Sequence, residues 1–247
     1  MAYQSVFKRY ELKYLLTQAQ KAKVLDAMAS HMVQDAYGRS TIRNIYFDTA
    51  SYRLIRHSID KPVYKEKLRI RSYHRAEADT PVFVELKRKY NGVVYKRRLS
   101  MPEQQAMAWI TGDGACPQDS QIGREIEYFL DFYQDLTPKV FLSYQREAYY
   151  AREDHTFRIT FDDHICARLQ DLSLESEPDG IALLPKDMVL MEVKCAGGIP
   201  LWLTQLLTQE KIYKTSFSKY GTAYQMLIFT KRKEEQTHAE PIVSRNL

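Results

Sequence analysis

Lysine and arginine residues recur at every second position in several segments of the sequence. The clearest segment is 65–71, where four cations alternate with Glu66, Leu68 and Ile70. Residues i and i+2 of a β-strand lie on the same face, so these cations would share one face. Like charges on one face repel each other unless an anion compensates them. The spacing therefore predicts a surface that binds a polyanion, either nucleic acid, membrane phosphate or a condensed phosphate.

Five further segments show the same alternation of charged and apolar residues. They are 6–14, 82–90, 93–101, 157–163 and 188–194. The cations on the six charged faces are Arg9, Lys13, Lys65, Lys67, Arg69, Arg71, Lys87, Lys89, Lys96, Arg98, Arg158 and Lys194, and the acids are Glu11, Glu85, Asp162 and Glu192. One such face is common in a solvated antiparallel sheet, but solvated faces normally mix both signs of charge. The excess of cations favours a barrel whose apolar side lies under helices and whose cationic side faces a lumen.

The elements that must position these side chains are predicted to be mainly strands. We expect strands at 6–13, 42–47, 65–73, 82–90, 93–101, 139–151, 157–163 and 188–194. Asn91-Gly92 predicts a hairpin turn because both residues tolerate positive φ. Helices are expected at 17–32, 103–110, 122–133, 201–210 and 220–229, the first with Thr17 as its N-cap. The predicted fold class is α+β, an antiparallel β-barrel tunnel of about eight strands with a polar, cationic lumen and flanking helices.

Length and composition limit the classes of protein to which the chain can belong. The chain has 247 residues, 45% of them hydrophobic, which is enough for a large core, and we expect one domain over 1–230 followed by a polar tail over 231–247. No apolar stretch approaches the roughly 20 residues of a membrane span, and the first residues do not form a signal peptide. The three cysteines have no paired spacing, so neither a disulfide framework nor a cysteine zinc site is predicted. We expect a cytoplasmic location, with attachment at the membrane periphery as the alternative.

Common catalytic motifs are missing from the sequence. It has no Gly-x-Ser-x-Gly elbow and no P-loop, and its six histidines show no metal-ligand spacing. A Ser-His-Asp hydrolase is therefore not supported. Any use of ATP would depend on cationic side chains, which can stabilise phosphoryl transfer by charge and positioning alone.

Eight motifs in order resemble the VTC (vacuolar transporter chaperone) domain of the triphosphate tunnel metalloenzymes, over about residues 5–230. They are Phe7-Lys-Arg-Tyr-Glu-Leu-Lys-Tyr14, Ile45-Tyr-Phe-Asp48, Lys67-Leu-Arg-Ile-Arg71, Val84-Glu-Leu-Lys87, Tyr144-Gln-Arg-Glu147, Arg158-Ile-Thr-Phe-Asp162, Met191-Glu-Val-Lys194 and Phe217-Ser-Lys-Tyr220. The resemblance implies an antiparallel β tunnel. A fungal branch of that family makes inorganic polyphosphate from ATP, and related branches hydrolyse triphosphate.

The resemblance also implies roles for individual residues. The positions that match phosphate-binding residues are Lys13, Arg69, Arg71, Lys87, Arg146, Arg158 and Lys219. Glu192 matches the carboxylate that binds a divalent metal, and all of these except Lys219 are expected to be catalytic. Further phosphate contacts are expected from Arg9, Lys67, Lys96, Lys194, Lys214 and Ser218. Glu11 and Glu85 either hold the metal, Mn²⁺ or Mg²⁺, or orient a neighbouring arginine.

The leading hypothesis is a phosphotransferase that moves the γ-phosphate of ATP to a growing polyphosphate chain. The alternatives are a metal-dependent triphosphatase and a noncatalytic module that binds polyphosphate or nucleotide. Expected partners are ATP, triphosphate, polyphosphate and a membrane protein. Nucleic acid is disfavoured because most strand aromatics share parity with the apolar face. Structural roles also stay open: Glu192 and Lys194 as an ion pair, Arg146 stacked on aromatic rings, and Ser218 as a helix cap.

Overall fold

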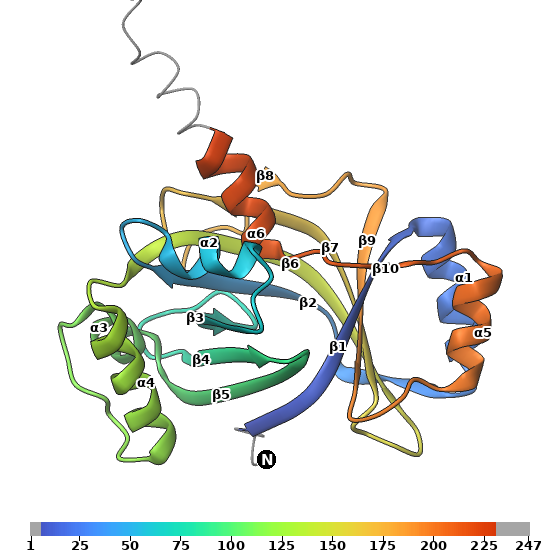
Figure 1. The fold of residues 1–247 in the computed structure, drawn as a ribbon, viewed down its shortest axis with the longest axis horizontal. Helices are drawn as coiled ribbons and strands as arrows, with labels where there is room; N and C mark the ends of the chain where they lie inside the picture. The colour runs from blue at the N-terminus through green and yellow to red at the C-terminus, as the bar shows by residue number, and fades with distance from the viewer. Residues whose placement is uncertain (1–5, 231–247) are drawn as a thin grey trace, which may run out of the picture.

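Eight antiparallel strands form a closed hydrogen-bonded ring in the computed structural model, which describes residues 6–230 (Figure 1). The ring strands are β1 (Val6–Thr17), β2 (Met32–Asp48), β3 (Tyr64–Ser72), β4 (Pro81–Tyr90), β5 (Val93–Pro102), β6 (Thr137–Ala151), β7 (Arg158–Arg168) and β9 (Met188–Cys195). Their order around the ring is β1-β5-β4-β3-β2-β6-β7-β9, and β9 pairs back with β1. This architecture confirms the predicted fold class, whereas the tail expected at 231–247 lies outside the described residues.

β1 pairs with different strands along its length. Val6–Arg9 pair with β5, whereas the segment from Tyr10 to Thr17 pairs with β9 on the other edge. Beyond Arg9, the edge that faced β5 bonds to the two-residue strand β10 (Lys214–Thr215) at Lys13 and Tyr14. The chain just before the last helices therefore completes this part of the wall. A second two-residue strand, β8 (Ile181–Ala182), extends the sheet beside β7.

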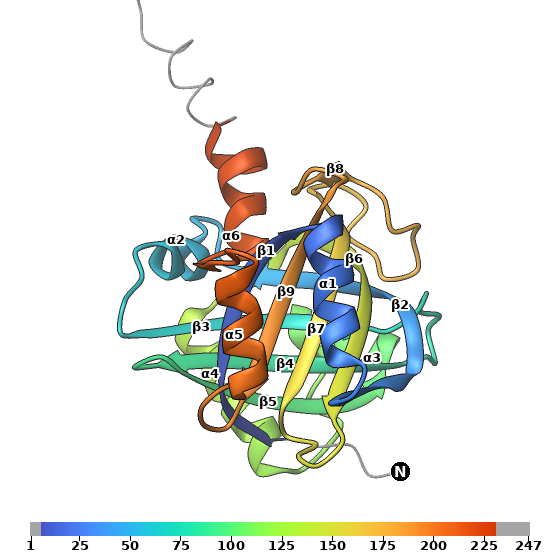
Figure 2. The same ribbon diagram turned by 90° about the vertical axis from the view of Figure 1, so that its right-hand side faces the viewer.

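Helices cover the outer side of the ring in pairs (Figures 1 and 2). They are α1 (Gln18–Met28), α2 (Arg53–Ile59), α3 (Glu103–Thr111), α4 (Gln121–Tyr133), α5 (Leu201–Gln209) and α6 (Lys219–Ala223), which continues as the π-helix η1 (Tyr224–Phe229). The apolar strand faces pack under α3 and α4 in one core, under α1 and α5 in a second, and under α2, α6 and η1 in a third. Because every strand's apolar side is used by these three cores, its charged side faces the lumen.

Local sequence signals predict several element boundaries. Asn91 and Gly92 have φ of 44° and 84°, which confirms the predicted hairpin turn between β4 and β5. Thr17 caps α1 through a capping box with Gln20, as expected of the N-cap. The expected end of this helix near Met32 was wrong: α1 ends at Met28, and Met32 reaches the same core from β2.

The parts of the fold that were not predicted are the first half of β2, the helix α2 and the two-residue strands β8 and β10. The first half of β2 was missed because most of its residues are polar and few are buried, and a bulge between Gln34 and Arg39 interrupts its alternation. The short helix α2 has no side-chain cap at its own N-cap residue. Its first backbone N–H groups are instead satisfied by Asp48, at the end of β2. Within residues 6–230, no helix has both the length and the apolar character to cross a membrane.

Candidate functional site: a cationic tunnel

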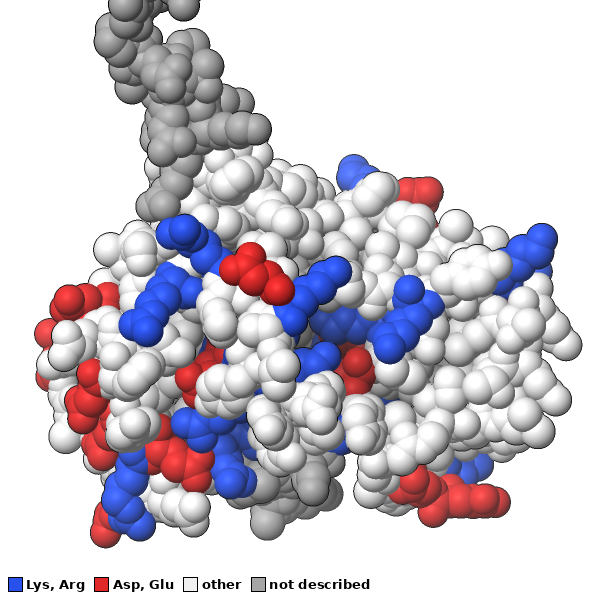
Figure 3. Space-filling view, viewed as in Figure 1, with Lys and Arg blue, Asp and Glu red and all other residues white. Residues whose placement is uncertain are grey.

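The lumen of the ring is a cavity of about 1430 Å³ lined by side chains from all eight ring strands. All twelve cations assigned to charged faces from the sequence line it, which confirms the parity argument. Four more cations join them: Lys61, Arg146, Lys214 and Lys219. Among the described lining residues the acids are Glu11, Asp35 and Glu192. Figure 3 shows Lys and Arg side chains gathered around the middle of the face that leads into this lumen.

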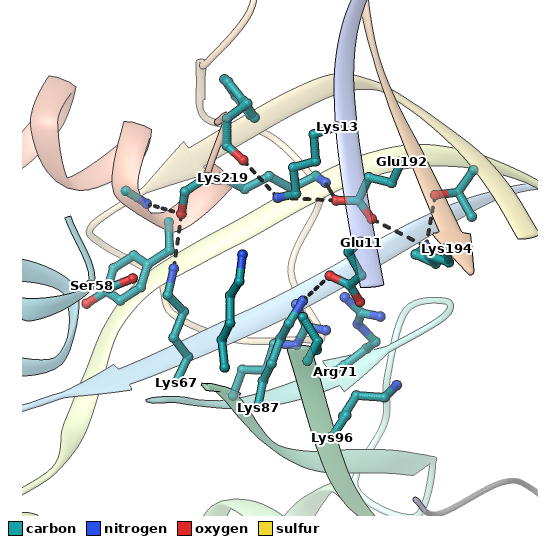
Figure 4. Close-up of a pocket in the computed structure, with 18 of the residues that line it drawn as sticks. Glu11, Lys13, Ser58, Lys67, Arg71, Lys87, Lys96, Glu192, Lys194 and Lys219 are labelled. Carbon is teal, nitrogen blue, oxygen red and sulfur yellow. Dashed lines mark hydrogen bonds and ion pairs between the residues drawn. The ribbon is translucent and has the colours of Figure 1, made fainter. Parts of the chain in front are cut away.

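Glu192 lies at the centre of a cluster of four cations (Figure 4). Its Oε1 is 3.5 Å from Lys13 Nζ and 3.3 Å from Lys219 Nζ. Its Oε2 is 3.3 Å from Lys194 Nζ and 3.6 Å from Arg146 Nη2. Burial alone would raise the pKa of Glu192, but these four cations hold the pKa well below its ordinary value. The carboxylate is therefore ionised, and the expected ion pair with Lys194 is one part of a larger network.

Asp162 supports this cluster from behind the cavity wall. It is fully buried and accepts two hydrogen bonds from Arg146, at 2.6 and 2.7 Å, and one from Lys219 at 2.6 Å. Burial would lower the pKa of Lys219, but Asp162 and Glu192 raise it above its ordinary value. Lys219 is thus a permanent cation with a fixed amine. The sequence placed Asp162 on the charged face but assigned it no part in the site.

Glu85 forms a second buried network. Its side chain has no exposed surface, and its carboxylate accepts from Arg69 Nε and Nη2 at 2.9 and 2.6 Å and from Lys96 at 3.0 Å. Arg71 Nε lies 3.9 Å away. Glu85 is not part of the cavity lining, so this geometry favours the alternative in which it orients arginines over the one in which it binds metal.

Lys96 would link the binding of an anion to the uptake of a proton, because its pKa lies near neutral pH. Burial lowers this pKa to about 7, against the raising effect of Glu85. The folded pKa lies below the ordinary value of 10.5, so charged Lys96 destabilises the fold below pH 7, and this cost disappears as the pH rises from 7 towards 10.5. A bound phosphate would raise the pKa, so binding above pH 7 should take up a proton.

We expect Lys96→Met to remove part of this proton uptake. The measurement is calorimetry of tripolyphosphate binding at pH 7.5 in two buffers of different ionisation enthalpy. Comparison with the wild type cancels the protons of the ligand itself. We also expect wild-type affinity to fall more steeply than that of Lys96→Met as the pH rises through 7. Equal proton uptake by the two proteins would contradict this account of Lys96.

Glu11 is the second ionised carboxylate inside the lumen. It accepts from Lys87 Nζ at 2.5 Å, and Arg9 Nη2 lies 3.7 Å away. Burial would raise its pKa, but Lys87 and Lys194 hold the pKa of Glu11 far below its ordinary value. Because Glu11 pairs directly with Lys194 across β1 and β9, it lies diagonal to Glu192 on the same face.

The segment before α6 brings further polar groups to the lumen. Phe217 O accepts from Lys13 Nζ at 2.8 Å, and Ser218 Oγ accepts from Lys67 Nζ at 3.0 Å. Ser218 also caps α6 by accepting from Gly221 N at 3.2 Å, so the capping role expected as an alternative is present together with a place in the cavity. Burial and the nearby cations, chiefly Lys13, lower the pKa of Lys67 well below its ordinary value.

Two phenols inside the tunnel were missed as site residues. Tyr46 Oη accepts from Arg69 and Tyr144 Oη accepts from Arg71, each at 2.8 Å. The Tyr144 ring also lies 4.5 Å from Lys219 Nζ and 5.0 Å from the guanidinium carbon of Arg146. Arg146 therefore both stacks on an aromatic ring and pairs with carboxylates. Both tyrosines occur in the quoted motifs, but aromatic residues in strands suggested core packing.

Two other expected residues lie nearer to solvent. Arg158 pairs with Asp35 at 3.7 Å, and its side chain is 38% exposed. Lys214 is exposed on β10 and borders the cavity. The structure thus brings all the expected phosphate-binding residues to one lumen, with these two at its periphery.

The donor set suits a hard divalent cation that is shared with a phosphate ligand. Across residues 6–230 there is no group of three or more His, Cys, Asp or Glu side chains that could hold a metal by itself. Glu192 and Glu11 are nevertheless ionised and face the lumen. Mg²⁺ is typically held by one or two carboxylates together with substrate phosphates. These two carboxylates therefore fit a Mn²⁺ or Mg²⁺ ion whose remaining ligands come from phosphate and water.

Comparison with family models decides the family. The model described as the VTC domain matches residues 8–228. The chain belongs to the VTC domain family. The match confirms the resemblance carried by the eight motifs. None of the curated proteins compared with this VTC domain matches its sequence.

Two solved structures share the fold of this VTC domain. A candidate adenylate cyclase from Bacillus halodurans is 13% identical with a TM-score of 0.56, and the superposition covers 91% of this chain and 100% of that one. A candidate adenylyl cyclase from Hippeastrum, with a dominant triphosphatase activity, is 16% identical with a TM-score of 0.50, covering 90% of this chain and 95% of that one. At these identities the likeness shows the fold alone, which is the triphosphate tunnel.

Proposed function

We propose that this VTC domain is a phosphotransferase that moves the γ-phosphate of ATP to a growing inorganic polyphosphate chain inside its tunnel. The observation that carries the proposal is the cluster of four cations around the ionised Glu192, within a lumen lined by sixteen cations. A loose phosphoryl-transfer transition state needs positioning and charge stabilisation, which such a lumen supplies.

The residues divide into bidentate and point-charge contacts. Arg69, Arg71 and Arg146 present planar guanidinium groups that can hold two phosphate oxygens, and carboxylates or phenols fix their orientation. Lys13 and Lys219 are point charges beside Glu192. We propose that these groups hold the β- and γ-phosphates in line with the terminal oxygen of the acceptor chain.

Glu192, with Glu11 beside it, would hold the divalent metal. A bound Mn²⁺ or Mg²⁺ supplies charge neutralisation at the phosphate oxygens. The carboxylates themselves keep neighbouring cations ordered and the local charge balanced. Lys194 and Lys87 bind these two carboxylates, so displacement of a lysine by the metal would free it for phosphate.

The alternative activity for the same site is hydrolysis of triphosphate, in which water replaces the acceptor chain. The Hippeastrum protein that shares the fold has a dominant triphosphatase activity. The third candidate function of the same lumen is binding of polyphosphate or nucleotide without turnover. Cytoplasmic location and a membrane-protein partner that takes up product belong to the proposal as expectations.

The products distinguish the three activities. Purified protein is incubated with ATP and Mn²⁺ or Mg²⁺, and the products are followed by ³¹P NMR. Internal polyphosphate signals that grow as ADP appears are the expected result. Orthophosphate without chain signals would identify a triphosphatase instead, and unchanged ATP would favour a binding module.

Condensed phosphate should bind more tightly than RNA of equal charge. Among the tyrosines that line the lumen, Tyr46 and Tyr144 are engaged with arginines and Tyr220 is buried, which leaves fewer rings to stack bases. We expect polyphosphate to compete fluorescent triphosphate out of the tunnel at concentrations at least about tenfold lower than single-stranded RNA of the same charge at 0.15 M salt. More effective competition by RNA would overturn this preference.

A further inference from the structure

Asp48 and Tyr220 join the end of β2 to helix α6 through a buried hydrogen bond. Asp48 has no exposed surface, and its carboxylate accepts from the backbone N–H groups of Thr49, Leu54 and Ile55. It also accepts from the Tyr220 hydroxyl at 3.0 Å. Asp48 thus fixes the start of α2 and, with the same carboxylate, the start of α6.

The ring of Tyr220 is fixed as firmly as its hydroxyl. It is 2% exposed and stacks on Tyr46 with the ring centroids 4.8 Å apart. Burial and the Asp48 carboxylate raise the pKa of Tyr220 well above its ordinary value, so its hydroxyl remains a donor. The hydroxyl is directed to Asp48, which does not line the cavity.

Other contacts that hold the chain beside Lys219 are the bond from Lys67 Nζ to Ser218 Oγ and the packing of Ala223 and Tyr224 in the third core. The preceding segment joins the ring through the two-residue strand β10 and the bond from Lys13 Nζ to Phe217 O. α6 itself has five residues before it continues as η1. A Cβ at Gly221 would lie 3.1 Å from Ser218, so the absence of a side chain there leaves room for the N-cap of α6, while Ile59 of α2 would be at an ordinary contact distance of 3.8 Å.

The position of the Lys219 amine matters because it forms ion pairs with two carboxylates at once. Its Nζ lies 2.6 Å from Asp162 and 3.3 Å from Glu192, the residue at the centre of the proposed site. A shift of α6 by a fraction of an ångström would lengthen both contacts. Tyr220 directly follows Lys219 in the chain, so the anchor acts one residue from the amine-bearing side chain.

We propose that Asp48 and Tyr220 are positioning residues, which hold α6 so that the Lys219 amine lies where a phosphate oxygen binds beside Glu192. This inference rests on the proposed function for the role of Lys219 toward phosphate. It assigns a function to Asp48 of the Ile45-Tyr-Phe-Asp48 motif and to Tyr220 of Phe217-Ser-Lys-Tyr220. Neither residue is expected to bind the transferred phosphoryl group.

The test uses Tyr220→Phe, which keeps the ring and removes only the hydroxyl. We expect its affinity for inorganic tripolyphosphate, measured by calorimetry, to fall about tenfold, because small misplacements of a binding group cost this much or more. The matched control is Tyr133→Phe. Tyr133 Oη donates to Glu66 Oε2 at 3.0 Å, outside the cavity lining, so its loss removes the same kind of bond and should leave affinity unchanged.

A double-mutant cycle separates positioning from general destabilisation. If Tyr220 acts through Lys219, Tyr220→Phe should change affinity by less than about twofold in a Lys219→Gln background. The same tenfold loss in both backgrounds would overturn the proposal. Wild-type affinity in the single variant Tyr220→Phe would overturn it as well.

A second measurement keeps the inference separate from the proposed function. If the wild type itself does not bind tripolyphosphate, the proposed function fails, and hydrogen exchange decides the positioning role. Amides 214–219 should then exchange faster in Tyr220→Phe than in Tyr133→Phe. Equal exchange in the two variants would show that Asp48 and Tyr220 do not hold this segment.

Discussion

Replacing Glu192 with glutamine is expected to lower kcat at least about 100-fold with ATP and Mn²⁺, the scale of removing one preorganised charge-stabilising group from an active site. The substitution keeps the shape of the side chain but removes the charge that orders four cations. It also removes the carboxylate best placed to hold a divalent cation. Steady-state formation of ADP measures the loss.

The same variant should separate catalysis from anion binding. Without its carboxylate the lumen is more positive, so metal-free tripolyphosphate should bind Glu192→Gln as tightly as the wild type or more tightly. The control is Glu125→Gln, which removes a carboxylate that pairs with Arg88 and Arg97 outside the lumen. The control should retain wild-type kcat. Near-wild-type turnover by Glu192→Gln would remove Glu192 from the proposed chemistry.

Replacing Glu85 with glutamine should give the largest loss of folding stability among the variants proposed here, about 3–5 kcal/mol. Glu85 is completely buried and is the shared counter-ion of Arg69, Arg71 and Lys96. Without it, the two buried guanidinium groups repel one another, and the buried Lys96 amine loses the carboxylate that raises its pKa. Chemical denaturation at pH 7 measures the change, and Glu125→Gln, whose carboxylate is partly exposed, should lose no more than about 1 kcal/mol.

The pH dependence of this loss has a defined sign. Burial would raise the pKa of Glu85, but Lys96, Arg71 and Arg69 hold the pKa well below its ordinary value of 4.5. A carboxylate with a lowered pKa contributes stability above the unfolded pKa and loses it as the pH falls through the folded pKa. The Glu85 carboxylate should therefore contribute its full stability near pH 7, and the difference in stability between wild type and Glu85→Gln should shrink below about pH 4.5.

Tripolyphosphate should partly restore the folding stability of Glu85→Gln. A bound anion supplies the missing negative charge and stabilises the folded state by linkage. Its melting temperature should rise more than that of the wild type at equal ligand concentration. A small stability loss, together with a fall in kcat with ATP and Mn²⁺ like that expected of Glu192→Gln, would return Glu85 to the role of metal ligand.

Strand parity predicted the composition of the lumen because it depends only on local geometry. Residues two apart in a strand share a face wherever the strand lies. The four cations of segment 65–71 could therefore be assigned to one surface from the sequence. Parity does not state which acid meets which cation. The contacts of Glu192 with Lys13 and Arg146 depend on the pairing of β9 with β1 and with β7, whose other edge carries β6, and β1 and β9 are far apart in the chain.

Helical and aromatic contributors were harder to predict. Lys219 reaches the lumen from α6, so the alternation of charged residues in strands could not predict its place there. Only its motif suggested a role. Tyr46 and Tyr144 orient arginines, although strand tyrosines are more often part of a core. The anchoring of α6 by Asp48 joins two motifs from opposite halves of the chain, a contact that neither motif reveals alone.

Anomalous diffraction from crystals grown with Mn²⁺ and a non-hydrolysable ATP analogue tests the central claim most directly. We predict a manganese peak at the Glu192 carboxylate, inside the lumen, with phosphate oxygens completing its ligands and with Lys13, Arg146 and Lys219 around the same phosphates. Manganese and triphosphate bound outside the tunnel, with Glu192 still surrounded by its four cations, would contradict the assignment of the lumen as the site of phosphoryl transfer.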